Sequence, residues 1–104
     1  MREFTFLIPE REDTSRKLHS AQKWHDLEKK LLAAFGGFTR QGIVGGSWAD
    51  DDGNIIEDTS RKYSICGEST SCWALLAAIL TQSKLDFDQQ CIYVAETSLA
   101  VVLY

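Results

Sequence analysis

The order in which extended and helical patterns alternate is the feature that most constrains the fold of this chain. Apolar side chains recurring at three- and four-residue steps predict two helices, and runs rich in β-branched and aromatic residues predict strands around them. We expect strands at residues 3–8, 38–49, 55–66, 90–95 and 99–103. The predicted order is strand, helix, strand, strand, helix, strand, which corresponds to two split β-α-β units. One further strand follows them here. The pattern therefore predicts an α+β, ferredoxin-like sandwich in which an antiparallel sheet carries both helices on one face.

The first helix has the clearest local signals. Ser20 is a suitable N-cap, and Gly36 and Gly37 supply the positive φ that ends a helix. The apolar stripe between them consists of Trp24, Leu27, Leu31, Ala34 and Phe35. A second helix is expected to begin after Ser69 or Ser71 and to run to about Lys84. Its predicted stripe is Cys72, Leu75, Leu76, Ile79 and Leu80.

Residues 38–66 read as a hairpin. The turn is predicted at Asp50-Asp51-Asp52-Gly53-Asn54, because Asp-Gly between two extended runs favours a tight turn with positive φ. The first strand of the hairpin contains Gly42, Gly45 and Gly46, which indicate a β-bulge or a backbone that another group approaches closely. Residues 10–18 are nearly all polar and are expected to form a mobile loop.

Length and charge exclude several classes of protein. A chain of 104 residues fits one domain, residues 1–104. It contains no apolar run of about 18 residues and no signal-peptide pattern, so we expect a cytoplasmic protein without a membrane partner. The net charge is −4, with +2 in residues 1–40 and −6 in residues 41–104. This acidic balance argues against a nucleic-acid partner.

The cysteines and histidines show no metal-binding or catalytic spacing. Cys66, Cys72 and Cys91 are an odd number without a CxxC pair, so reduced thiols are expected, with Cys72 and Cys91 in the core. His19 and His25 are six residues apart and are interpreted as surface side chains. We expect no metal site and no cofactor.

The second hairpin strand holds the candidate catalytic residues. Glu57 and Tyr63 have the spacing that places both on one face, where a carboxylate and a phenol can move a proton or polarise a small ligand. A cross-strand polar ladder on the open face of the sheet explains the same residues without a ligand. The residues predicted to bind a ligand beside this pair are Trp48, Ser60, Gly45 and Gly46.

Two resemblances to known families follow from these motifs. The motifs Phe35-Gly36-Gly37-Phe38-Thr39 and Gly46-Ser47-Trp48-Ala49-Asp50, with a first strand that ends in Leu7-Ile8-Pro9, resemble a widespread group of small bacterial proteins of unknown function. That resemblance implies a ferredoxin-like fold and no assigned activity.

More distantly, the element order and the ending Gln90-Cys91-Ile92-Tyr93-Val94 are similar to phage-encoded S-adenosylmethionine lyases, which are relatives of the PII-like trimers. This resemblance implies an active site between subunits, with Glu57 at the position of the catalytic glutamate and Tyr63 at that of a tyrosine.

Two functions therefore remain open. The first is a non-enzymatic homo-oligomer, a dimer or trimer, that binds a small molecule or a protein through its open sheet face or its subunit interface. The alternative is a small lyase that acts on S-adenosylmethionine, or on a similar molecule, at a subunit interface with Glu57 and Tyr63. Self-association is expected in both cases, because five strands and two helices in 104 residues leave one sheet face that a single copy covers poorly.

Overall fold

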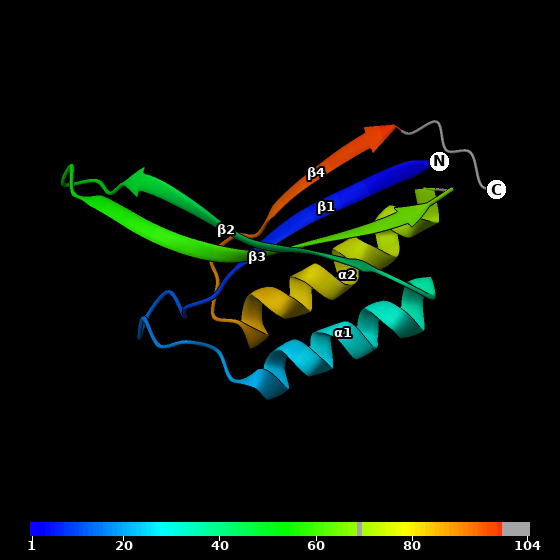
Figure 1. Cartoon of the computed structure of the whole chain (residues 1–104), viewed down its shortest axis with the longest axis horizontal. Coiled ribbons are helices and arrows are strands. Elements are labelled where there is room, and N and C mark those ends of the chain that lie inside the picture. Colours follow the sequence, from blue (N-terminus) through cyan, green and yellow to red (C-terminus); the bar gives the residue numbers. More distant parts are fainter. Residues whose placement is uncertain (69, 99–104) are drawn as a thin grey trace.

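The computed structural model describes residues 1–68 and 70–98, which form one four-stranded antiparallel sheet with both helices on the same face (Figure 1). The strand order is β2-β3-β1-β4. The elements are β1 (Arg2–Pro9), α1 (Ala21–Phe35), β2 (Thr39–Ala49), β3 (Ile55–Gly67), α2 (Thr70–Asp86) and β4 (Tyr93–Ser98). The predicted fold class is confirmed. The strand expected at 99–103 and the candidate cap Ser69 lie outside the described residues.

Helix α1 begins and ends where its sequence predicts. The Ser20 side chain accepts a hydrogen bond from the Lys23 backbone N–H, as an N-cap does. At the other end Gly36 adopts φ 75°, and its N–H donates to the Leu32 carbonyl. Neither helix in the described part of the chain is long and apolar enough to cross a membrane.

The core lies between the sheet and the two helices. Alternate residues of β1 and β3 point toward the helices, because successive side chains of a strand face opposite sides. The buried apolar residues are Phe4, Phe6, Ile8, Trp24, Leu27, Leu31, Tyr63, Ile65, Leu76, Leu80 and Phe87. Cys72 packs against this cluster, as predicted. The prediction for Leu75 is wrong: α2 buries Leu76, Leu80 and Ser83, and Leu75 lies on its exposed side.

The β2–β3 hairpin projects beyond the helices, and we call residues 43–61 the arm (Figure 1). The arm contributes to a molecule 49 Å long and only 26 by 23 Å in the other directions. The predicted bulge lies between Arg40 and Ile43, where Gly42 has φ 88°. At the tip, Gly53 has φ 81° and the Asp50 N–H donates to the Asn54 carbonyl, so the predicted turn is confirmed.

Residues 10–18, which we call the clasp, connect β1 to α1 around the base of the arm. Arg11 pairs with Leu18 in an isolated antiparallel bridge, so the segment folds back on itself. The Glu10 N–H donates to the Thr59 carbonyl of β3 at 2.9 Å, and the Asp13 N–H donates to the Asp88 carbonyl at 3.0 Å. The polar segment predicted as a mobile loop is thus tied to two other parts of the fold.

Candidate functional site on the arm

Glu57 and Tyr63 both lie on β3 but are not brought together within one chain. The strand separates them by six residues, which at roughly 3.3 Å per residue is about 20 Å. Glu57 is exposed on the arm, whereas Tyr63 is buried under the sheet. A single small ligand on one protomer therefore does not contact both side chains.

Tyr63 belongs to a polar cluster with Glu28 of α1 and Arg40 of β2. The Tyr63 hydroxyl donates to Glu28 Oε2 at 2.8 Å, and Arg40 Nε donates to the same oxygen at 3.0 Å. Burial, together with the Glu28 carboxylate, raises the pKa of Tyr63 to about 12. The Arg40 hydrogen bond, aided by the one from Tyr63, lowers the pKa of Glu28 against the opposing effect of burial. The phenol is consequently a hydrogen-bond donor at neutral pH.

Sequence reasoning missed Glu28. It lies among the charged residues of α1, and 35 residues separate it from Tyr63. Periodicity places Glu28 next to the apolar stripe but does not say which strand it meets. No local signal identifies this pair.

Gly45, Gly46 and Glu57 do come together, in an open depression of about 460 Å³ that we call the glycine depression. The register places Gly45 opposite Thr59, Gly46 opposite Asp58 and Ser47 opposite Glu57, and Arg11 of the clasp completes the lining. An added Cβ at either glycine would meet no described atom within 4 Å. The close approach that these glycines suggest therefore does not come from the described part of the same chain.

Trp48 lines a second depression, of about 530 Å³, which we call the tryptophan depression. The Trp48 side chain is 50% exposed and pairs across the hairpin with Ile56. The other lining residues are Pro9, Asp13, Arg16, Asp58, Gln89, Gln90 and Cys91. They come from β1, the clasp, the arm and the turn before β4, so this depression brings together segments far apart in the sequence.

The structure corrects the prediction that Cys91 is a core residue, and it shows where Ser60, a predicted ligand-binding residue, lies. Cys91 was predicted to be a core residue of a strand, but β4 begins only at Tyr93 and Cys91 is exposed in the turn before it. Ser60 is half-buried between Val44 of β2 and Pro9 of β1. It sits at the base of the arm, between the neighbouring strands on either side.

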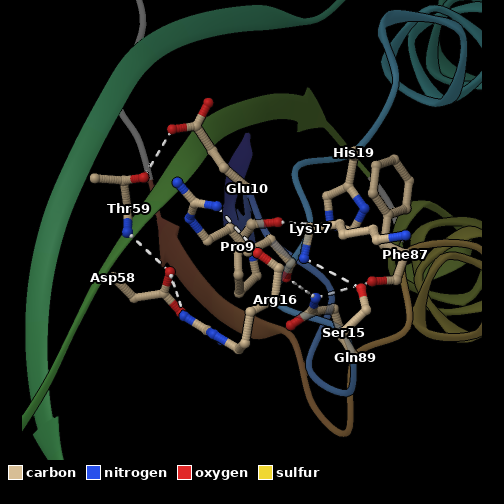
Figure 2. A network of polar contacts seen from close by, with 11 residues as sticks. Pro9, Glu10, Ser15, Arg16, Lys17, His19, Asp58, Thr59, Phe87 and Gln89 are labelled. Atoms are coloured by element: carbon tan, nitrogen blue, oxygen red, sulfur yellow. Dashed lines mark hydrogen bonds and ion pairs between the residues drawn. The ribbon is translucent and has the colours of Figure 1, made fainter.

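Polar contacts connect the clasp with the arm and with the turn before β4 (Figure 2). Thr59 Oγ1 donates to Glu10 Oε1 at 2.8 Å, and Arg16 forms an ion pair with Asp58 at 3.4 Å. On the other side, Gln89 Nε2 donates to the Arg11 carbonyl at 2.8 Å. The arm is thereby linked, through the clasp, to the turn between α2 and β4.

His19 is buried, and its prediction as a surface residue is wrong. Its side chain is 8% exposed, and its ring packs nearly perpendicular to Trp24 and Phe87, with centroids 5.6 and 4.8 Å away. Its Nε2 lies 3.0 Å from the Pro9 carbonyl oxygen. Burial is the main cause that lowers its pKa below 6.5. The error arises because Phe87, 68 positions later in the sequence, supplies one wall.

The acidic turn of the arm has a structural role. Asp50 Oδ1 accepts hydrogen bonds from the backbone N–H groups of Asp52 and Asn54 at 3.0 and 2.8 Å. These bonds lower the pKa of Asp50. Among residues 1–68 and 70–98, no three His, Cys, Asp or Glu side chains gather closely enough to hold a metal ion.

Comparison with known proteins finds similarity in structure but not in sequence. No family model and no curated protein matches the chain. A phage S-adenosylmethionine lyase in complex with S-methyl-5'-thioadenosine is similar in structure, with a TM-score of 0.63 and 14% identity over 92% of this chain and 79% of that one. The periplasmic divalent cation tolerance protein CutA from Archaeoglobus fulgidus has a TM-score of 0.64 and 12% identity over 99% and 88% of the two chains. The divalent cation tolerance protein CutA1 from Thermus thermophilus has a TM-score of 0.63 and 10% identity over 99% and 88%.

At these identities the similarity establishes a shared fold. It confirms the α+β, ferredoxin-like architecture and the predicted structural relation to the phage lyases. The resemblance to the small bacterial proteins with the Phe-Gly-Gly-x-Thr motif stays a prediction.

Proposed function

We propose that the protein is a homo-oligomer that binds a small molecule on the arm, at a site completed by a second subunit. The observation that supports this best is the exposure of apolar side chains on a projecting hairpin. Ile43, Trp48 and Ile55 are 61%, 50% and 69% exposed. An isolated two-stranded hairpin is only marginally stable in water, and exposed apolar groups on a projecting element are typical of interaction surfaces. Trp48 faces the opposite side of the hairpin from Ile43 and Ile55. Packing of other subunits on both sides of the arm removes these side chains from water.

The two depressions support the ligand-binding half of the proposal. Ligand sites usually measure roughly 300–1,000 Å³ and combine apolar walls with a few placed polar groups. The tryptophan depression offers an indole face together with the ion pair of Arg16 and Asp58. The glycine depression offers the Glu57 carboxylate beside the backbone of Gly45 and Gly46. Both are open on the protomer, so a neighbouring subunit is needed to enclose a ligand.

The lyase alternative specifies which ligand to test first. A protein of the same fold is a phage S-adenosylmethionine lyase that binds S-methyl-5'-thioadenosine. In this chain Glu57 is exposed where a substrate reaches it, whereas Tyr63 is buried and its hydroxyl donates to Glu28. Because the two are about 20 Å apart along β3, a lyase site that uses both takes Glu57 from one subunit and Tyr63 from another, and the Tyr63 hydroxyl must leave Glu28 and become exposed to reach a substrate.

We place the protein in the cytoplasm. Its cysteines Cys66, Cys72 and Cys91 are all described and all free. Unpaired thiols are typical of reducing compartments.

Sedimentation velocity and titration calorimetry test the proposal. We expect a dimer or trimer, and binding of S-adenosylmethionine or S-methyl-5'-thioadenosine that Trp48→Ala weakens at least tenfold. Trp73→Ala is the matched control, because Trp73 is a half-exposed tryptophan on α2 that lines neither depression. Glu57→Gln separates the two functions. If the wild type turns over S-adenosylmethionine and Glu57→Gln binds it without turnover, the lyase is supported. If the wild type shows no turnover and Glu57→Gln binds as well as the wild type, the binding protein is supported. A monomer that binds neither compound contradicts both.

A further inference from the structure

The two nitrogens of the His19 imidazole have unequal surroundings. Nε2 lies 3.0 Å from the Pro9 carbonyl oxygen, which only accepts hydrogen bonds, so Nε2 carries the proton. Nδ1 is buried and has no hydrogen-bond partner among residues 1–68 and 70–98. A second proton would therefore place an N–H and a positive charge where no acceptor lies. An unpaired buried donor and an uncompensated charge are both costly.

His19 is also the point at which the clasp closes. Its backbone N–H donates to the Glu10 carbonyl at 3.0 Å, and its side chain holds the Pro9 carbonyl one residue earlier. His19 thus fastens the last residues of the clasp to its first ones. The imidazole itself lies between Trp24 of α1 and Phe87 after α2, so the same side chain anchors the clasp to the helix layer.

The far side of the clasp forms part of the tryptophan depression. Asp13 and Arg16 line it directly, and Arg16 pairs with Asp58 of the arm at 3.4 Å. Asp13 Oδ2 also accepts a hydrogen bond from the Gln90 N–H at 2.8 Å. Movement of the clasp away from the arm therefore removes two polar walls of this depression at once.

Charged groups reach His19 from three segments and partly cancel. Lys23 of α1 disfavours an imidazolium, whereas Glu12 of the clasp and Asp88 of the turn before β4 favour one. Arg61 of β3 lies over the Trp24 ring that His19 contacts, with its Cζ 4.3 Å from the ring centroid. Burial is the largest influence on the pKa of His19. With Lys23 it outweighs the Pro9 hydrogen bond and the two carboxylates, which raise that pKa, so the closed clasp favours the neutral imidazole.

We propose that His19 is a pH-sensitive latch whose protonation releases the clasp from the arm and opens the tryptophan depression. The effect of the latch on ligand binding rests on the proposed function, whereas the pH-dependent release of the clasp does not. The direction follows from linkage. A released His19 regains an ordinary affinity for protons, so the released state binds the proton more tightly than the closed one. The closed clasp is favoured above about pH 6.5 and is lost progressively as the pH falls below that value, by at most tenfold per pH unit.

Hydrogen–deuterium exchange tests the latch on the intact protein without any ligand. The probes are the Glu10 and Asp13 amides, which the closed clasp bonds to Thr59 and Asp88. After correction for intrinsic rates, we expect these amides to open more often at pH 5.5 than at pH 7.5, by up to about tenfold. Amides in the middle of α1 serve as the internal reference. Ordinary carboxylates titrate near pH 4, below this range.

The two histidines of the chain provide a matched pair of variants. His19→Gln keeps a side-chain donor for the Pro9 carbonyl but does not titrate, so the pH dependence of the clasp amides should disappear. His25→Gln removes the exposed histidine of α1 and should leave the dependence unchanged. The latch is overturned if opening of the clasp amides depends equally on pH in the wild type and in His19→Gln, or if it does not depend on pH in the wild type. If His19→Gln does not fold, an NMR titration of wild-type His19 decides: a pKa at or above 6.5 overturns it.

Calorimetry at both pH values separates this proposal from the proposed function. With a working latch and a working site, S-adenosylmethionine should bind more weakly at pH 5.5 than at pH 7.5 in the wild type, by no more than the fold-change in clasp opening, and equally at both in His19→Gln. If S-adenosylmethionine binds at neither pH, the proposed ligand site is wrong. The exchange data still test the latch in that case.

Discussion

Removal of the Tyr63 hydroxyl tests whether the cluster formed by buried Tyr63, half-buried Glu28 and exposed Arg40 stabilises the fold. In Tyr63→Phe the aromatic ring and its stacking on Phe6 remain, and only the 2.8 Å hydrogen bond to Glu28 is lost. Hydrogen bonds to charged groups contribute roughly 1.5–3 kcal/mol. Because Glu28 keeps its Arg40 partner, we expect the lower part of that range, about 2 kcal/mol. For a domain of this size that lowers Tm by roughly 8 °C.

Thermal and urea unfolding at pH 7, followed by circular dichroism at equal protein concentration, measure this change. Tyr93→Phe is the matched control, because Tyr93 is largely exposed on β4 and should change the free energy of unfolding by less than about 0.5 kcal/mol. If Tyr63→Phe behaves like Tyr93→Phe, the structural role assigned to the Tyr63 hydroxyl is wrong. A variant of normal stability that has lost S-adenosylmethionine turnover would instead point to a catalytic phenol.

The pH dependence of the same variant gives an independent check. The pKa of Tyr63 rises from 10.0 to about 12 in the folded protein. A raised pKa means that the stabilisation is fully present below pH 10 and is lost as the pH rises toward 12. The difference in stability between wild type and Tyr63→Phe should therefore shrink between pH 10 and pH 12. A difference that stays constant over this range contradicts the assignment.

Two further predictions concern the core and the start of α2. Leu31→Ala should cost roughly 2–5 kcal/mol because Leu31 is fully buried, whereas Leu32→Ala, on the exposed side of the same helix, should cost less than about 1 kcal/mol in urea unfolding. Gly67→Ala should cost roughly 1–3 kcal/mol, because a new Cβ would lie 2.2 Å from Cys72 Sγ. Cys72→Ala should not restore the stability of Gly67→Ala, since the Cys72 Cβ is itself only 2.7 Å away; full rescue would refute this explanation.

Local signals predicted much of the fold. The start of α1 at Ser20, its end at Gly36 and the turn at Gly53 were all predicted, because each depends on residues within one turn of the backbone. The alternation that places Tyr63 and Ile65 on one face of β3 also follows from adjacent residues.

The candidate site depends on contacts that adjacent residues do not determine. Glu28 meets Tyr63, and Phe87 covers His19, only after the sheet and the helices pack together. Face alternation correctly put Glu57 and Tyr63 on the same side of β3. It did not reveal that the helix layer covers Tyr63 and leaves Glu57 out on the arm.

The bulge at Gly42 determines which side of the hairpin each later side chain of β2 faces. Arg40 pairs with Tyr63 and Ile43 with Arg61, so two residues three positions apart face the same side, where an unbroken strand would turn them to opposite sides. Deletion of one residue here would turn the β2 side chains of the arm to the opposite side of the hairpin and move Trp48 to its other surface. The core residues would keep their positions. Changes in length at this position are therefore tolerated in steps of two, and a single-residue change exchanges one surface of the arm for the other.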